Sequence, residues 1–583
     1  MTDTPGGDVS PDNTTDADTI EPGRRLIRLP AECGQSLADR VAQHFHRLTW
    51  RTPLHRLRLR GRYPLKLLTV PVDPGAPDRA AGKAIRAGHF LFRGLKKPIA
   101  KIDFAELGVT TSFADHIHGF HWLRDLAAVA PREEAAPIAE RLTRAWLKAH
   151  NEQIAEPAWR GDVAAWRLLL WTAHAPLILS SRDIVYRSLV LNNIARTARH
   201  LDQTAHRLRP GVPQLVAWCG VVTASLLIPG GEPRRIFGED GLKTSLESAF
   251  YVDGGTVSRS PQAQLDAIGA LNMLVRAYEA RNIEPPLFVR EMLALAVPAL
   301  LGLVHTDGGL GSWQGSGAIA AEQVEAIVEA TGVRTRPLKQ ARDWGYQRLS
   351  AKRTVLMVDA APPPVARLTD AGCASTLAFE LSQGDHRIVV NCGGAALAGA
   401  LIPQSLAQGL RTTAAHSTLT LADSNSTAIH PDGTLGKGVT EVEIDRREGD
   451  GASRLVMSHD GYARRLGFTH RRLLILTETG KELRGEDLLL PTARRRDKQR
   501  GFVIRFHLTP DWQPTMTADG QGALLRHAEG SVWQFRCSGG ALSVEDSLWV
   551  DENGRPHPSC QLAISGTAQR GGVSVGWLFK QMG

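Results

Sequence analysis

Leu377-Ala-Phe-Glu-Leu-Ser-Gln-Gly-Asp-His-Arg-Ile-Val-Val-Asn391 is the stretch where the hydrophobic pattern of the chain changes its period. Its first, third and fifth residues are apolar and fall on one face of an extended strand, with Glu380 on the other face. Upstream of Ala361, hydrophobic residues recur at helical spacing for roughly three hundred residues. The sequence therefore predicts a helical half followed by a strand half, and a ligand site in the cleft between them.

The overall composition is that of a globular protein with more than one domain. A chain of 583 residues is too long for one ordinary hydrophobic core, so we expect two large domains. Its 43% hydrophobic and 22% charged residues are typical of soluble globular chains. The net charge of +9 favours polyanions, and a solubilising surface explains it equally well. Six cysteines without a C-x-x-C pair argue against a zinc ribbon and a disulfide framework.

The N-terminal residues 1–25 are rich in Asp, Thr, Pro and Gly and lack the basic and apolar segments of a signal peptide. We interpret them as a disordered tail, followed by a helical domain over residues 26–345 and a strand domain over residues 346–583. The chain has no apolar run of about eighteen residues, so no membrane span is expected. The predicted location is the cytoplasm, with the periplasm as the alternative.

The helical half shows a series of amphipathic segments separated by short Gly- or Pro-containing turns, which is typical of consecutive antiparallel hairpins. No fixed-length repeat is visible, so a closed toroid is favoured over a repeat solenoid. Residues 51–98 have no clear pattern. The predicted helices include Val163–Leu179, Arg182–Leu208, Val212–Leu227, Gln262–Arg281, Leu287–Leu303 and Ala321–Ala330.

Many short alternating segments with Gly, Asp and Asn turns predict an antiparallel β-sandwich after Arg353. These segments include Val355–Val358, Ala378–Leu381, Ile388–Asn391, Thr418–Leu421, Leu473–Thr477, Phe502–Leu508, Ser543–Trp549 and Val573–Phe579.

Two polar segments of the helical half are candidate binding sites. Asn192 and Asn193 fall within a predicted helix. Because Asn is a poor helix former, the pair indicates a role for its polar side chains, such as binding a ligand. The loop Tyr251–Pro261 carries two glycines and Arg259, which is suited to grip a carboxylate with two hydrogen bonds. An exposed helix surface and an ordinary loop are the alternatives.

Two histidines of the strand half are candidates for chemistry. Leu419 and Leu421 predict an inward face, which leaves His416 on the opposite face. The alternation in Phe502–Leu508 likewise leaves Arg505 and His507 side by side on a polar face. Such a His is available for acid–base catalysis or metal binding, and a solvated surface His is the alternative.

Several ordered motifs together resemble those of the heparinase II/III-like family. They are the helical hairpins, Asp253-Gly-Gly with Arg259-Ser-Pro261, Leu377-Ala-Phe-Glu-Leu381, Ala415-His-Ser-Thr418 and Arg505-Phe-His507. The resemblance implies an incomplete α/α toroid followed by an antiparallel β-sandwich, with a polysaccharide groove between them. It also implies β-elimination on chains that contain uronic acids.

This elimination needs a group that neutralises the uronate carboxylate and a Tyr or His base that removes the neighbouring proton. If the chain is an enzyme, we expect Asn193 to hold the carboxylate and His416 or His507, helped by Tyr251, to act in place of the family base. Asn192, Arg259 and Arg505 are the expected substrate-binding residues.

The sequence departs from the family pattern at the residues that would do the chemistry. Ala263 stands where the family has Tyr, and an Ala cannot abstract a proton. Ala371 and Cys373 replace the His-x-His pair, and Asn391 replaces an acid. Family members also hold zinc, for which this chain offers Cys373, Asn391 and His416. Because Asn is a poor zinc ligand, we expect no cofactor, with a weak zinc site held by Cys373 and His416 as the alternative.

Two functional hypotheses follow. The first is a lyase that acts on or binds an acidic polysaccharide or oligosaccharide. The second is a degenerate glycan-binding or scaffold protein that keeps the fold and the groove. Nucleic acid is not an expected partner, because no basic motif interleaved with aromatic residues is present.

Overall fold

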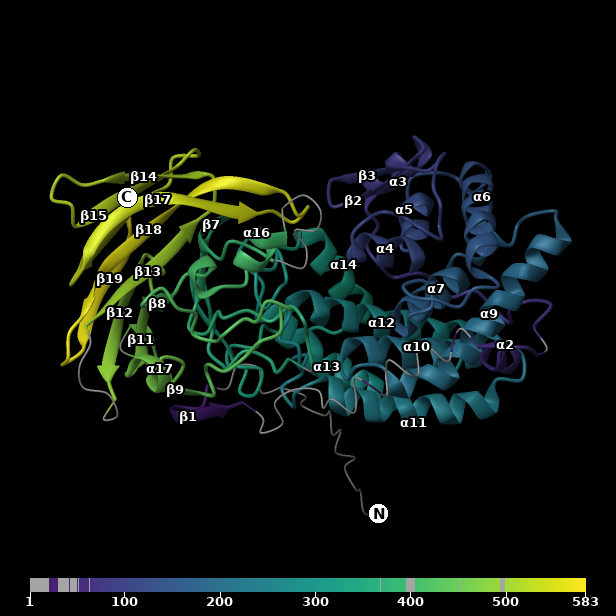
Figure 1. The fold of residues 1–583 in the computed structure, drawn as a ribbon, viewed down its shortest axis with the longest axis horizontal. Helices are drawn as coiled ribbons and strands as arrows, with labels where there is room; N and C mark the ends of the chain where they lie inside the picture. The colour runs from purple at the N-terminus through teal and green to yellow at the C-terminus, as the bar shows by residue number, and fades with distance from the viewer. Residues whose placement is uncertain are drawn as a thin grey trace, which may run out of the picture.

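The computed structural model describes residues 20–29, 41, 50, 52–61, 63–366, 368–394, 404–449, 451–492 and 499–582. Figure 1 shows a helical half, coloured purple to teal, beside a strand half, coloured green to yellow. Most of the predicted tail, residues 1–19, lies outside the described residues. None of the described helices is long and apolar enough to cross a membrane.

The helical half is built of helices that pack both against the next helix in the chain and against helices two or three positions away. Helix α10 is buried along most of its length and packs against α7, α9, α11 and α12. The helices are α2 (Pro53–Arg58), α3 (Arg79–Arg86), α4 (Thr111–His118), α5 (Trp122–Ala127), α6 (Arg132–His150), α7 (Gly161–Ala173), α8 (Ala175–Ile178), α9 (Ile184–Thr204), α10 (Val212–Leu227), α11 (Glu232–Ala249), α12 (Pro261–Ala280), α13 (Leu287–Leu301) and α14 (Ala321–Thr331).

The unassigned segment 51–98 contains α2, α3 and a two-stranded hairpin, β2 (His89–Phe92) and β3 (Leu95–Pro98). Asp78 caps α3 by accepting a hydrogen bond from the backbone N–H of Ala81. Arg93, at the turn between the two strands, has a φ of 47°, a left-handed conformation that is uncommon for a residue with a side chain.

The loop before α12 is held by one buried amide side chain. Gln264 accepts a hydrogen bond from the N–H of Thr256 and donates to the carbonyls of Gly254 and Ala296. Gly254 has a φ of 82°, and a Cβ there would lie 2.2 Å from the carbonyl oxygen of Leu295. Glycine is therefore required where this loop crosses α13.

The strand half is an antiparallel sandwich, as the alternation predicted. The larger sheet has the order β1-β9-β10-β11-β12-β19-β16-β15-β14, and the smaller has the order β17-β18-β13-β7-β6-β5-β4, with β8 on β13. The strands are β1 (Gly23–Arg28), β4 (Tyr346–Ala351), β5 (Thr354–Asp359), β6 (Phe379–Gln383), β7 (His386–Val390), β8 (Leu419–Leu421), β9 (Glu441–Gly449), β10 (Ala452–His459), β11 (Phe468–Thr477), β12 (Glu482–Pro491), β13 (Arg500–Leu508), β14 (Trp512–Met516), β15 (Gly522–His527), β16 (Val532–Ser538), β17 (Ala541–Val550), β18 (Pro556–Ala568) and β19 (Val573–Met582).

Strand β1 joins the larger sheet from the other end of the chain. It pairs antiparallel with β9, with Ile27 opposite Val442 (Figure 1). The segment before the helices therefore belongs to the strand half, and Gly23-Arg24-Arg25 is ordered strand within the region that the sequence suggested was a tail.

Strand β6 is buried on both faces. Phe379 stacks on Trp577 of the opposite sheet, with ring centroids 5.5 Å apart, as its predicted inward position requires. Glu380 points the other way, and it accepts hydrogen bonds from Ser312 N (3.1 Å) and Asn391 Nδ2 (2.9 Å) and lies 2.7 Å from His305 Nε2. The second face is buried because the segment 305–312, which follows α13, covers it.

Candidate functional site

An open cleft of about 460 Å³ lies on the helical half, and we name it the helical cleft. Its walls come from the β2–β3 turn, α4, the first turns of α7 and α12, and α14. Glu552 and Asn553, in the turn between β17 and β18, close one end, so the strand half also contributes to it. The cleft thus lies where a helical and a strand domain meet, a common place for ligand sites.

Aromatic and imidazole rings line part of this cleft. Trp166 is partly exposed, and its ring centroid lies 5.1 Å from that of His121, which stacks on His116 at 5.6 Å. Burial lowers the pKa of His116 to about 3 and that of His121 well below its usual value, so both rings are neutral at pH 7. Flat aromatic faces with neutral polar edges suit the apolar face and hydroxyls of a sugar ring.

Two of the three arginines in the cleft lining are already paired. Arg124 donates two hydrogen bonds of 2.8 Å to Asp73, and Arg160 bridges Asp115 (2.8 Å) and Asp162 (2.7 Å). Both guanidinium groups are therefore neutralised by carboxylates from neighbouring segments.

The third arginine, Arg93, differs from the other two. Among the described residues its Nη1 has no hydrogen-bond partner, and burial lowers its pKa to about 10, with Asp266 as the nearby acid. Burial in turn raises the pKa of Asp266 to about 6, although Gln262 donates to that carboxylate at 2.9 Å. Arg93 is thus the lining cation best placed to bind a polar ligand atom.

Carboxylates outnumber cations in the helical cleft. Its lining contains Arg93, Arg124 and Arg160 against Asp78, Asp115, Asp125, Asp162, Asp266 and Glu552. Burial raises the pKa of Asp125 to about 7, so not all six carry a full charge at neutral pH. The local balance is nonetheless negative, in contrast to the net positive charge of the chain.

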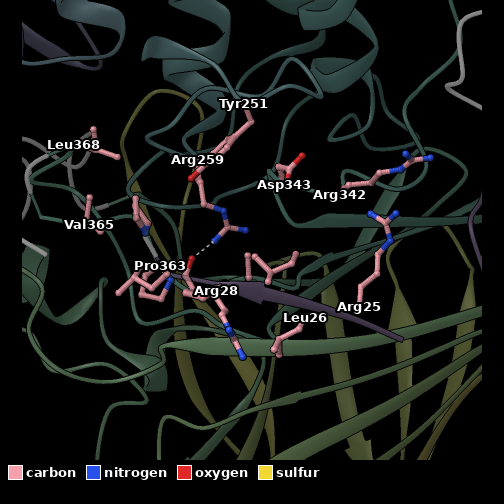
Figure 2. Close-up of a pocket in the computed structure, with 15 residues that line it drawn as sticks. Arg25, Leu26, Arg28, Tyr251, Arg259, Arg342, Asp343, Pro363, Val365 and Leu368 are labelled. Atoms are coloured by element: carbon pink, nitrogen blue, oxygen red, sulfur yellow. Dashed lines mark hydrogen bonds between the residues drawn. The ribbon is translucent and has the colours of Figure 1, made fainter. Parts of the chain in front are cut away.

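A second cavity, of about 260 Å³, contains two of the predicted site residues, and we name it the Arg259 pocket. Figure 2 shows Tyr251 and Arg259 on one side of it and Arg25 and Arg342 on another. Arg259 is buried, and it donates to Asp359 Oδ1 (2.6 Å), Trp344 O (2.8 Å) and Pro362 O (3.0 Å). These protein groups occupy the donors that were predicted to grip a ligand carboxylate.

Tyr251 lines the same pocket, and burial raises the pKa of its phenol, which makes the phenolate form less accessible. Arg25 and Arg342 both form ion pairs with Glu21.

The asparagine pair lies elsewhere. Asn193 is buried in α9, 3.4 Å from both Asn151 Oδ1 and Thr197 Oγ1. Asn192 lines a separate hollow beside α2 together with Arg196. Neither residue lines the helical cleft or the Arg259 pocket. The carboxylate-binding role of the pair remains a prediction.

His416, His507 and Arg505 lie within the sandwich, and none of them lines either cavity. His416 is 2% exposed and its Nδ1 lies 2.7 Å from Thr412 O. His507 is 3% exposed and its Nε2 lies 3.0 Å from Ala414 O. Burial lowers the pKa of both rings. The face on which they were predicted is thus buried, because the polar side of this sheet is covered.

The zinc set implied by the resemblance is engaged in other contacts. Asn391 Oδ1 accepts a hydrogen bond from Ser417 N at 3.0 Å, and Cys373 Sγ lies 3.5 Å from Ala371 O. Burial raises the pKa of Cys373 to about 11, so its sulfur is a thiol at neutral pH.

The residues of the helical cleft were not found from the sequence. Gln262 and Asp266 lie four residues apart just after Ser260-Pro261, where a helix is expected to start. This spacing places both polar side chains on one helix face, so the sequence could have indicated them as a pair. Arg93 and Trp166 carried no such signal, because their proximity depends on how the β2–β3 hairpin and α7 pack.

Comparisons with known proteins agree with this architecture. Residues 333–578 match the family model "Heparinase II/III-like, C-terminal". FtsZ-localized protein C from Caulobacter vibrioides is 28% identical over 535 residues, which cover 89% of this chain and 90% of that protein.

Two solved structures show the same fold. Heparinase III superposes with a TM-score of 0.68 at 12% identity, over 96% of this chain and 93% of its own. The chondroitin AC lyase of Streptomyces coelicolor, in complex with chondroitin sulphate, superposes with a TM-score of 0.51 at 10% identity, over 86% and 78%. The α/α toroid followed by a β-sandwich is therefore the fold of this chain.

Proposed function

Because residues 333–578 match the heparinase II/III-like C-terminal family model and the chain has the heparinase III fold, we propose that it binds a polysaccharide chain in the helical cleft and does not cleave it by β-elimination. The observation that carries the proposal is a contrast between two regions. The helical cleft is open and lined by Trp166 and His121, whereas Ala263 replaces the expected base and His416 and His507 are buried.

The charge of the cleft bears on the kind of glycan. Six carboxylates stand against three arginines, and two of these arginines are already paired. A densely charged uronate or sulphated chain would be repelled, so we propose that a neutral or sparsely charged chain binds best. An acidic glycan cleaved by elimination, which the resemblance implies, is the competing hypothesis.

The site of action is the second part of the proposal. FtsZ-localized protein C aligns with this chain over nine-tenths of its own length. We propose that this chain likewise localises with FtsZ. A fluorescent fusion expressed at native level should co-localise with FtsZ at the division site, and a diffuse signal during division would contradict this part.

The glycan proposal is tested with the purified full-length protein on an array of neutral, amino-sugar, uronate and sulphated oligosaccharides. Neutral or sparsely charged chains should bind, and Trp166→Ala should weaken their affinity about tenfold, because one aromatic face is lost. Trp549→Ala is the matched control, since Trp549 is a partly exposed Trp outside the cleft lining.

Turnover is followed by the absorbance of the unsaturated product. Its appearance with any chain would establish a lyase and overturn the non-cleaving proposal. Binding that Trp166→Ala leaves unchanged would exclude the helical cleft as the site.

A further inference from the structure

The two sheets of the sandwich each contribute a histidine to one cluster at the sandwich edge. His386 is the first residue of β7 in the smaller sheet, and His527 is the last residue of β15 in the larger sheet. Glu529 follows in the turn to β16. The three residues offer ligand atoms that all lie within 4.8 Å of one another.

From this cluster, we propose that His386, His527 and Glu529 bind a divalent transition-metal ion, with Zn²⁺ as its representative. Two imidazole nitrogens and one carboxylate oxygen form a ligand set that suits Zn²⁺, Ni²⁺, Co²⁺ and Cu²⁺. Ca²⁺ and Mg²⁺ prefer oxygen ligands and would bind poorly. Three protein ligands leave a fourth position for water or an added ligand.

The geometry of the cluster is close to what an ion needs. His386 Nε2 lies 3.4 Å from Glu529 Oε2, and the ligand atoms of all three residues lie within 4.8 Å of one another. Ligand atoms held tetrahedrally at about 2.0–2.2 Å from a metal are separated by about 3.3–3.6 Å, so small side-chain rotations suffice.

Neighbouring groups hold this arrangement in place. Trp512 of β14 packs against both imidazoles, and its Nε1 donates to Arg387 O at 2.7 Å, which fixes the wall behind the site. The Glu529 N–H donates to His527 Nδ1 at 3.2 Å, a long hydrogen bond that an ion on that nitrogen would replace.

The electrostatics also favour an ion. Burial, together with His386, lowers the pKa of His527, so its ring is neutral near neutral pH. The facing carboxylates of Asp511 and Glu529 oppose that shift and would partly neutralise a bound cation. His386 is 20% exposed and Glu529 is 73% exposed at the side chain, so an ion can enter from solvent.

The proposed ion would connect the two sheets, since its ligands come from β7 and from the β15–β16 turn. It would therefore stabilise the folded chain without taking part in glycan binding, because neither His386 nor His527 lines the helical cleft. The site is also separate from the Cys373, Asn391 and His416 set.

The test uses untagged full-length protein that has been treated with chelator and dialysed. Isothermal titration with ZnCl₂ should show one site, and His386→Ala and His527→Ala should each weaken its affinity at least about tenfold. Glu529→Gln should also weaken it, and this change carries little risk for folding because the side chain is exposed. His557→Ala is the control, since His557 lies 3.0 Å from Asp551 on another part of the surface.

Two further measurements make the test decisive. The melting temperature should rise with Zn²⁺ but not with Mg²⁺, and the rise should be absent in His527→Ala. Cu²⁺ bound to the wild type should show coupling to two nitrogens in its electron paramagnetic resonance spectrum, and coupling to one in His386→Ala. Zinc binding that all three cluster variants leave unchanged, or the absence of binding, would overturn the proposal.

Discussion

Arg259 illustrates how a sequence motif can identify an important residue and leave its task open. The motif Arg259-Ser-Pro261 predicted a guanidinium that binds ligand, and the structure places that guanidinium against Asp359 and two carbonyl oxygens. Asp359 is itself bound by Gln314 and Ser375 on its other oxygen. A buried pair of this kind joins the loop before α12 to β5.

Arg259→Leu should therefore act on stability. Removing one partner leaves Asp359 buried and uncompensated, and we expect the free energy of unfolding to fall by about 3–5 kcal/mol. Arg342→Leu, at the rim of the same pocket, should change it by less than about 1 kcal/mol. Urea denaturation followed by circular dichroism measures both. A stable Arg259→Leu protein that has lost ligand binding would instead support the carboxylate-binding role.

The buried carboxylate of Asp487 should make the stability of the sandwich sensitive to acid. Burial alone would raise its pKa, but Arg472 and His470 hold that pKa well below its usual value, and Trp577 Nε1 also donates to it. Because the pKa is depressed in the folded state, this stabilisation is fully present above about pH 4 and is lost as the pH falls toward the folded pKa.

Asp487→Asn should lose about 3–5 kcal/mol of unfolding free energy at pH 7 and should show a weaker further loss between pH 4 and pH 2 than the wild type. Urea unfolding at a series of pH values measures this. Asp385→Asn, at an acid whose side chain is 84% exposed, is the control and should follow the wild-type pH dependence. An unchanged acid profile in Asp487→Asn would show that other carboxylates dominate.

At the scale of elements, most of the fold could be predicted from the hydrophobic period. The alternation around Phe379 identified a strand with one core-facing side, and the helical spacing from Val163 onward gave real helices, because each pattern reflects local geometry. The sequence could not show that Glu380 is buried as well. That depends on the segment 305–312 covering the sheet, which is a tertiary contact.

Strand β1 was missed for the same reason. Its partner β9 lies more than four hundred positions away in sequence, as the pairing of Ile27 with Val442 shows. The site residues were predicted less accurately than the helices and strands. The proximity of Asn193, Arg259 and His416 was inferred only from the order of the motifs along the chain. Motif order carries no information about which side chains converge.

The attachment of β1 to the larger sheet can be tested by comparing substitutions on its core-facing side and on its exposed side. Ile27 packs against the sandwich core, whereas Leu26 is 47% exposed. Ile27→Asp should detach the strand and accelerate amide hydrogen exchange in β9 at least about tenfold, because the edge hydrogen bonds open more often. Leu26→Asp should leave that exchange nearly unchanged. Equal effects from the two substitutions would contradict a role of Ile27 in anchoring the strand to the core.

At the scale of the whole molecule, the helical cleft combines a toroid of helices, a hairpin from a segment that had no sequence pattern, and a turn from the sandwich. The lining residues of the cleft therefore come together only when the whole chain is folded. Asp266 gives this cleft a measurable pH dependence, because burial raises its pKa to about 6. Gln262 of the same helix donates a hydrogen bond to it, and Arg93 is the nearby cation.

The affinity of the cleft for an acidic oligosaccharide should depend on pH. Between pH 7 and pH 5 Asp266 gains a proton, and Asp125, whose pKa is about 7, gains one over an overlapping range. Each protonation removes a negative charge from the lining, so affinity for an acidic chain should rise as the pH falls. A neutral chain should bind with nearly the same affinity throughout, because it does not sense the lost charge.

Asp266→Asn separates this effect from a general response to pH. At pH 7 it should strengthen binding of the acidic chain about three- to tenfold and reduce the remaining pH dependence, and the double change with Asp125→Asn should abolish most of it. Affinities are measured by isothermal titration at constant ionic strength, since salt would screen the repulsion. Equal gains for acidic and neutral chains would show that Asp266 contacts the sugar directly, and repulsion by the carboxylates would then no longer explain the choice of ligand.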